Sequence, residues 1–340
     1  MQSTNSRLAA RYLAAIASVT LVCLALAFFF NALVDPLWYF SGNQLKSINF
    51  AFNERVSKAS LIAGHENEFD CIIFGDSRAT LLPEARIKDH QCFNFAFSAG
   101  AINEFVAYAR WLKVRGLNPS LVIVGVSASD FRERKAPHNI PDFILENRDP
   151  TSPFIKYLST DVLAMSWRTL FGSSPIDRYY TSTFQCQVAV TSHYDPHTPI
   201  RDLHTGPFDN RAPLEQYRAL KAIFPDAEFV GYTPPISAYA ILDYKKIGWL
   251  QSYTSALIDV AGVFDRFHDA SIPSPITVDP ANTYDGTHYS SIVNARIAEG
   301  LLSDPGPFAI DLKHMTSAQM EDAYRARLIK YREEMQSRLN

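Results

Sequence analysis

Two short motifs, one early in the chain and one late, carry residue types that could act as a nucleophile and its base. Ser77 follows an apolar run and Gly75, in the sequence FGDSR at residues 74–78. A serine at the carboxyl end of a buried strand lies at the sheet edge where open α/β proteins bind ligands. A helix beginning near Ser77 could stabilise an anion with its free N–H groups, although a plain N-cap favours the same residue types.

The late motif reads YDGTHYS at residues 284–290. Asp285 and His288 are three residues apart at the start of a helical pattern, so the carboxylate can reach the imidazole. Such a carboxylate fixes the tautomer of the imidazole and stabilises the imidazolium that forms during proton transfer. An Asp-Gly surface turn or a structural histidine is the alternative. Together the two motifs predict a triad of Ser77, His288 and Asp285.

Strand and helix patterns alternate along the chain around these motifs. Short apolar runs bounded by turn residues are typical of buried strands. Strands that alternate with helices predict a parallel sheet covered on both faces, and here an α/β fold with about five strands. The strands are expected at residues 71–74, 92–97, 121–124, 228–232 and 262–265, and the helices at 102–114, 214–223, 244–260 and 290–302.

Residues 131–210 interrupt this alternation. The stretch is rich in Pro, Asp, His, Ser and Thr, with a helical pattern at residues 160–171. We interpret it as an insertion, which can shape a substrate site or stay peripheral. Its histidines, His193, His197 and His204, are too loosely spaced to indicate a metal site.

The tail, residues 311–340, predicts an amphipathic helix. Thr316 and Gln319 could form a capping box at its start. Apolar side chains follow at three- and four-residue steps, at Met320, Tyr324, Leu328, Tyr331 and Met335. Such a stripe can pack on its own domain or bind a partner, and we favour packing on its own domain.

An uncharged apolar run of about 23 residues, 12–34, dominates the N-terminus. Its length suits a helix that crosses the hydrocarbon core of a bilayer. Arg7 and Arg11 precede it, so the positive-inside rule places residues 1–11 in the cytoplasm and the rest of the chain outside. A cleaved signal peptide is the alternative, but the apolar run continues well past the small residues at 25–27.

We therefore divide the chain into the cytoplasmic residues 1–11, a single-pass anchor at 12–34, a connector at 35–68, a catalytic domain at 69–310 and the tail.

The net charge is −3, and no basic run is present that would bind nucleic acid. No Gly-x-Gly-x-x-Gly spacing or Walker lysine accompanies Gly75, so we expect no cofactor.

The four cysteines are Cys23, Cys71, Cys92 and Cys186. None of their spacings matches a metal site, so we expect no metal. Cys71 and Cys92 each begin a predicted strand, and a disulfide between neighbouring strands could form outside the cytoplasm. We nevertheless expect two buried free thiols.

The order of the two motifs resembles that of the SGNH (GDSL-type) serine hydrolases, over residues 70 to about 302. The resemblance implies a flavodoxin-like, three-layer α/β/α fold. It also implies Ser77 as nucleophile, His288 as general base and Asp285 as the acid that orients it. The second conserved block of the family implies that Gly100 belongs to the oxyanion hole. Backbone N–H groups of Ser77 and Gly100 would then bind the oxygen of the tetrahedral intermediate.

The third block differs from the family pattern. Most members carry an Asn shortly after the third strand, whereas residues 125–130 read GVSASD and place Ser127 there. The Ser127 hydroxyl could donate a weaker hydrogen bond to the oxyanion. Because loss of one oxyanion donor can cost about 10²–10³ in rate, a non-catalytic scaffold or glycan-binding protein of an envelope polysaccharide system remains the alternative.

The missing Asn and the Asp35-Pro36 pair after the anchor resemble a membrane-anchored branch of this superfamily. That branch includes O-acetyltransferases and D-alanyl transfer proteins of bacterial envelope polysaccharides. The resemblance implies a serine O-acyltransferase or esterase in the cytoplasmic membrane, with a periplasmic or extracellular catalytic domain. Its substrate would be an envelope glycan or acylated carrier, and a membrane acyltransferase could be its partner.

Arg78 directly follows the candidate nucleophile. It could bind an anionic substrate group, or it could pair with Asp76, and we slightly favour the pairing.

Overall fold

The computed structural model describes residues 2–131, 140–150, 152–174, 178–181, 184–188, 194–198, 208–209 and 211–339. The chain forms two compact units. The N-terminal unit comprises Met1–Leu61 and Pro150–Phe184, and the α/β unit comprises Ile62–Asp149 and Gln185–Asn340. Part of the stretch interpreted as an insertion therefore belongs with the N-terminal segment, and both chemical motifs lie in the α/β unit.

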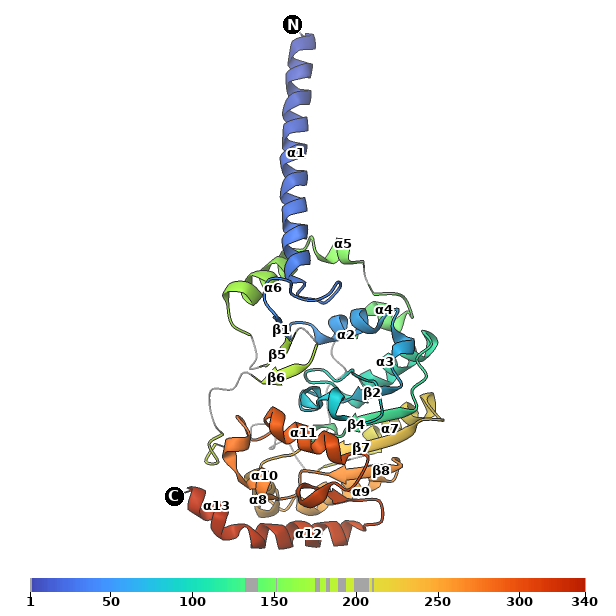
Figure 1. Cartoon of the computed structure of the whole chain (residues 1–340), viewed down its shortest axis with the longest axis vertical. Coiled ribbons are helices and arrows are strands. Elements are labelled where there is room, and N and C mark those ends of the chain that lie inside the picture. Colours follow the sequence, from blue (N-terminus) through green and yellow to red (C-terminus); the bar gives the residue numbers. More distant parts are fainter. Residues whose placement is uncertain are drawn as a thin grey trace. The chain divides into compact units, whose positions relative to one another are not determined.

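A six-stranded sheet forms the centre of the α/β unit (Figure 1). Five strands are parallel, and the sixth, at one edge, is antiparallel. In spatial order they are β3 (Cys92–Asn94), β2 (Cys71–Phe74), β4 (Leu121–Gly125), β7 (Glu228–Thr233), β8 (Arg266–Asp269) and β9 (Ile310–Asp311). The prediction of an α/β fold is confirmed, with one antiparallel strand added to the expected parallel ones.

Successive side chains of a strand point to opposite faces of the sheet. The central strands are buried along their whole length, and helices cover both faces. The α-helices in the described part of the unit are α3 (Ile102–Val114), α4 (Asp142–Leu145), α7 (Arg211–Ile223), α8 (Ala238–Lys246), α9 (Leu250–Ala261), α10 (Pro275–Val278), α11 (Ser291–Gly300), α12 (Ser317–Lys330) and α13 (Arg332–Leu339). Ile73 packs in one apolar cluster with Ala298 of α11. Its neighbour Phe74 packs against Phe105 of α3, with ring centroids 5.6 Å apart. The short strand β6 (Cys186–Val188) lies outside the sheet.

The last parallel strand lies beyond the position that the sequence predicted. Residues 262–265 form the turn after α9, and the strand starts directly after them. The side chain of Asp265 accepts a hydrogen bond from the N–H of Phe229 at 2.9 Å, which holds this turn against β7. Phe264 stacks on Phe229 with ring centroids 4.6 Å apart. The apolar pattern of this segment thus reflects a turn packed on the core.

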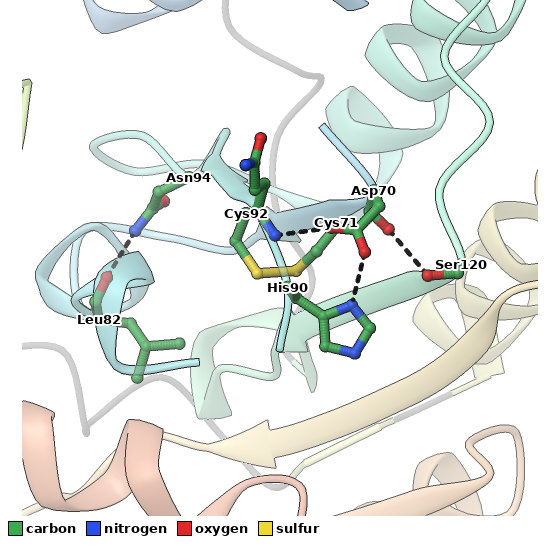
Figure 2. Close-up of a disulfide and its surroundings, with 8 residues drawn as sticks. Asp70, Cys71, Leu82, His90, Cys92, Asn94 and Ser120 are labelled. Carbon is green, nitrogen blue, oxygen red and sulfur yellow. Dashed lines mark hydrogen bonds and ion pairs between the residues drawn. A yellow bond between two sulfur atoms is a disulfide. The ribbon is translucent and has the colours of Figure 1, made fainter. Parts of the chain in front are cut away.

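Cys71 and Cys92 are register partners at the start of β2 and β3, and they form a disulfide (Figure 2). Our expectation of two free thiols is therefore wrong. The parallel register places the two Cα atoms 4.2 Å apart. Asp70 braces the same end of the sheet, because its carboxylate contacts His90 at 3.0 Å and its carbonyl accepts a hydrogen bond from Ser120 at 2.8 Å.

The C-terminal helix packs on its own domain, as we expected. Thr316 and Gln319 form the predicted capping box, and the helix then runs through α12 and, after a break at Tyr331, α13. All five predicted stripe residues are buried. Tyr324 makes the most specific contact, because its hydroxyl donates to the carboxylate of Asp269 at 2.5 Å. A buried polar contact of this kind fixes the helix on the end of β8.

The N-terminal unit is built around the apolar helix α1 (Gln2–Val34). It also contains β1 (Ile48–Phe50), most of α2 (Glu54–Ile62), α5 (Pro153–Lys156), α6 (Thr160–Phe171) and β5 (Arg178–Thr181), and β1 pairs antiparallel with β5. The stretch Arg7–Val34 is the one helix of the described chain that is long and apolar enough to cross a membrane. The predicted anchor is thus a single continuous helix of spanning length.

Candidate active site

Ser77 lies in a tight turn after β2, and two glycines make that turn possible. Gly75 has φ +152°, and a Cβ on it would lie 2.4 Å from the Cβ of Ala79. A Cβ on Gly125, at the end of β4, would lie 2.8 Å from the same atom. The chain after Ser77 therefore folds back closely over the ends of two strands. The helix expected there is only a short 3-10 helix, Ala79–Leu81, so it does not supply the N-terminal anion site we had considered.

Asn94, the last residue of β3, holds the segment that follows Ser77. Its buried amide donates to the carbonyl of Leu82 at 3.0 Å (Figure 2). The amide also donates to the carbonyl of Ala79 at 2.9 Å, and its oxygen accepts from the N–H of Ala96 at 3.1 Å. Sequence reasoning gave Asn94 no role. Its signal was an amide inside an otherwise apolar buried run, because such a group needs hydrogen-bond partners.

The three predicted triad residues come together in the structure. Ser77 Oγ lies 2.7 Å from Nε2 of His288, and Nδ1 of His288 lies 2.7 Å from Oδ2 of Asp285. Nδ1–H therefore donates to the carboxylate, which leaves Nε2 as the acceptor that faces the serine hydroxyl. The first distance suits proton transfer from the serine hydroxyl to the imidazole, and the second suits a hydrogen bond that orients the ring.

The loop that carries Asp285 and His288 is held from within. The buried Thr283 hydroxyl donates to the His288 carbonyl at 2.8 Å and accepts from the N–H of Gly286 at 3.0 Å. Gly286 has φ +83°, a conformation that favours glycine in this turn. The ring of Tyr284 stacks on the imidazole with centroids 5.5 Å apart. We did not single out Thr283 or Tyr284 from the sequence.

Asp285 is ionised at neutral pH. Burial alone would raise the pKa of its carboxyl, but the hydrogen bond and charge of His288, with two backbone N–H donors, lower that pKa to about 2. Those donors are the N–H groups of Thr287 at 2.8 Å and of His288 at 2.7 Å. A carboxylate held in this way can orient the imidazole and stabilise its protonated form.

Arg78 forms a buried ion pair with Asp76, the arrangement that we slightly favoured. The guanidinium donates to the carboxylate at 2.9 Å and 3.2 Å, and also to the hydroxyl of Ser127. Burial would raise the pKa of Asp76, but the charge and hydrogen bonds of Arg78 lower it to about 2. In this conformation, Arg78 is committed to the protein interior and not to an anionic ligand.

The two residues expected in the oxyanion hole, besides Ser77, already have protein partners. The N–H of Gly100 donates to the carbonyl of Phe97 at 3.0 Å. The hydroxyl of Ser127 lies 2.5 Å from that of Ser129 and accepts from Arg78. An oxyanion formed at Ser77 would have to compete with these contacts for either donor.

Within the described residues, no group of three or more His, Cys, Asp or Glu side chains could hold a metal ion. His193 and His204 lie outside the described residues. His197 is described, and its backbone N–H donates to Asp195 at 2.9 Å.

Comparison of the chain with protein-family models, with curated proteins and with solved structures finds no match in any of the three. The functional interpretation therefore depends on the geometry of the two motifs. That geometry is a hydrogen-bonded Ser-His-Asp arrangement at the end of a central strand in an α/β unit.

Proposed function

We propose that this protein is a membrane-anchored serine acyl-ester enzyme of the SGNH type, acting as an O-acyltransferase or an esterase. The observation that carries this proposal is the pair of 2.7 Å contacts that link Ser77, His288 and Asp285. A serine hydroxyl needs an adjacent base to become a nucleophile, and the base needs a third group to orient it. All three roles are filled here.

The proposed reaction has two steps. His288 takes the proton from Ser77, whose Oγ attacks the acyl carbonyl; the proton then passes from His288 to the leaving alcohol oxygen, which leaves an acyl-serine. In the second step His288 takes a proton from the acceptor, whose oxygen attacks the acyl-serine, and returns that proton to Ser77. Water as acceptor gives an esterase, and a sugar hydroxyl gives a transferase.

The strand order supports the resemblance to the SGNH superfamily. Numbered along the chain, the five parallel strands are arranged 2-1-3-4-5, the order of flavodoxin-like folds. Ser77 follows the first of them and therefore sits at the carboxyl edge, where ligands bind in such sheets.

The anchor and the disulfide support a location outside the cytoplasm. Disulfides persist in oxidising compartments and are rare in the cytosol, and the bridge between Cys71 and Cys92 lies in the core of the α/β unit. Arg7 and Arg11 before the apolar helix favour the same orientation. An envelope glycan or an acylated carrier is the substrate that the resemblance implies, with a membrane acyltransferase as partner.

The proposal can be tested with the detergent-solubilised full chain. Wild-type protein should hydrolyse p-nitrophenyl acetate and become labelled at Ser77 by a fluorophosphonate, and Ser77→Ala should lose both properties. Ser303→Ala removes an exposed serine and serves as the matched control. If folded wild-type protein resists the probe, and turnover survives the Ser77 substitution, the proposal is wrong.

A non-catalytic, glycan-binding scaffold is the second candidate, and one observation favours it. The N–H of Gly100 and the hydroxyl of Ser127 already form hydrogen bonds with protein groups. An oxyanion would then lack these donors, although oxyanion stabilisation is usually a large part of catalysis. Mass spectrometry after incubation with acetylated glycans separates the candidates. An acyl adduct on Ser77 supports the enzyme and identifies the acyl group, whereas glycan binding without an adduct or turnover supports the scaffold.

A further inference from the structure

The N-terminal unit exposes a row of large apolar side chains on α6. Leu163, Trp167 and Phe171 are spaced four residues apart, so they share one face of the helix. Their exposed fractions are 39%, 61% and 67%. Trp167 and Phe171 also contact each other, with ring centroids 4.5 Å apart. We call these three residues the α6 stripe.

Helix α6 is fixed to the end of α1 by buried polar contacts. The amide of Asn31 donates to the carbonyl of Tyr157 at 2.8 Å, and its oxygen accepts from the hydroxyl of Ser166 at 2.8 Å. The Tyr157 hydroxyl in turn donates to the buried carboxylate of Asp35. Since these partners are buried and mutually satisfied, α6 keeps a fixed position relative to the last turn of α1.

This position corresponds to the surface of a bilayer. A helix rises 1.5 Å per residue, so residues 12–31 of α1 cover about 30 Å, the thickness of the hydrocarbon core. Asn31 therefore lies where α1 leaves the core. Phe30, one residue before it, lines an open apolar groove together with Leu163 and Trp167. The α6 stripe thus sits at the depth of the headgroup boundary.

A second apolar group beside α1 supports the same depth. Phe154 and Ile155 of α5 are about as exposed as Trp167. The Phe154 ring stacks on Phe28 of α1 with centroids 5.2 Å apart. Figure 1 shows α5 and α6 around the end of α1 that leads into the rest of the N-terminal unit.

Three basic side chains lie near the stripe, against one exposed acid of α6, Asp161. Lys156 and Arg168 are exposed next to the apolar residues, and Lys46 binds the Leu170 carbonyl at the carboxyl end of α6. Tryptophan rings flanked by basic side chains are typical of membrane interfaces, where the rings lie at headgroup level and the cations meet phosphates.

We propose that α5 and α6 form a second membrane contact, in which the α6 stripe inserts into the phospholipid headgroup region beside α1. The proposal rests on α1 being the membrane anchor. It commits to lipid as the occupant because the stripe continues the apolar surface of α1, whose most apolar stretch is not buried in the protein. Two contacts would keep the N-terminal unit from pivoting about a single helix.

Tryptophan quenching tests this proposal in the full chain. We would reconstitute wild-type protein and Trp167→Phe in phosphatidylcholine–phosphatidylglycerol nanodiscs, with and without lipids brominated near the glycerol end of the acyl chain. Trp38, Trp111 and Trp249 remain in both proteins as an internal reference, and Trp38 and Trp111 are buried. Wild-type emission should be quenched by the brominated lipid, and Trp167→Phe should lose most of that quenching.

Equal quenching of the two proteins would overturn the proposal. A second outcome would also overturn it: brominated lipid does not quench Trp167 emission, but the emission changes with the number of protein copies per nanodisc. A second copy of the chain would then cover the stripe. Phe29→Trp in the Trp167→Phe background reports on α1. Quenching of Trp at position 29 but not of Trp167 defeats the α6 proposal alone, and quenching of neither defeats the anchor as well. Fluorophosphonate labelling of Ser77 is unaffected by these outcomes and tests the enzymatic proposal separately.

Discussion

His288 Nε2 lies 2.7 Å from Ser77 Oγ, although 211 residues separate the two in the chain. The contact depends on two independent local structures. One is the glycine-dependent turn after β2, and the other is the loop pinned by the Thr283 hydroxyl. Because each structure also satisfies its own hydrogen bonds, both hold their side chains in these positions.

The first prediction concerns the acid of the triad. Asp285→Asn should leave the fold intact but lower the turnover number by about 10⁴, because an amide favours the wrong tautomer of His288. Ester hydrolysis measured on the detergent-solubilised chain checks this. Asp304→Asn, at an exposed site outside the triad, is the control. Unchanged turnover in Asp285→Asn would show that the carboxylate has no part in catalysis.

The second prediction concerns Asn94. Asn94→Ala leaves the buried carbonyls of Ala79 and Leu82 without their amide donor, and it should lower the free energy of unfolding by about 2–3 kcal/mol. It should also slow fluorophosphonate labelling, since the segment after Ser77 loses its brace. Denaturant unfolding and labelling rates measure the two effects. Asn118→Ala, an exposed amide, should change stability by less than about 0.5 kcal/mol.

The sequence predicted the central strands well because each is a continuous apolar run between turn residues. Four of the five begin at the predicted residue, two of them running one residue longer than predicted, and the fifth failed where a turn packs aromatic Phe264 into the core. The triad could be predicted because Asp-x-x-His spacing and a strand-end serine are local signals. The order of the motifs along the chain added the family resemblance.

The remaining features depend on contacts that no local pattern records. The disulfide needs Cys71 and Cys92 to be register partners, which follows only from the strand order. The link between Asp35 and Tyr157 joins residues 122 apart, so the sequence showed only a connector and an insertion. The family resemblance indicated Gly100 as a residue of the oxyanion hole. The sequence could not show that the N–H of Gly100 donates to the carbonyl of Phe97.

The third prediction concerns the disulfide. Cys71→Ala/Cys92→Ala should lower the free energy of unfolding by about 3 kcal/mol, because the bridge closes a loop of 21 residues in the unfolded chain. Cys186→Ala removes a buried cysteine that lies outside the disulfide and is the comparison for lost packing. Unfolding of wild type with and without reductant gives an independent value. If reductant leaves wild-type stability unchanged, the two thiols are not bridged in the folded protein.

The fourth prediction separates a structural from a substrate-binding role for Arg78. Arg78→Met leaves Asp76 buried and unpaired and should cost about 3–5 kcal/mol of stability. Asp76→Asn/Arg78→Met removes both charges and should recover part of that loss. A substrate-binding arginine would instead raise KM for anionic substrates with little change in stability. Thermal unfolding and KM values, measured for acetate and succinate esters, distinguish the two roles.

The last prediction is the acid stability of the α/β unit. The pKa of Asp76 falls from its usual 3.8 to about 2 in the folded protein, because Arg78 outweighs the opposing effect of burial. A carboxyl whose folded pKa is depressed stabilises the fold fully above its unfolded pKa and loses that contribution as the pH falls. Wild-type stability should therefore decline between about pH 4 and pH 2.

Asp76→Asn should be less stable than wild type at neutral pH and should lose less stability over this acid window. Asp285→Asn should change the acid stability in the same direction, because the pKa of Asp285 is also lowered to about 2. Burial opposes this shift, but the hydrogen bond and charge of His288 outweigh it. Circular dichroism melts at a series of pH values measure both. If the wild type and Asp76→Asn decline in parallel from pH 4 to pH 2, Asp76 does not hold its charge through the pair with Arg78.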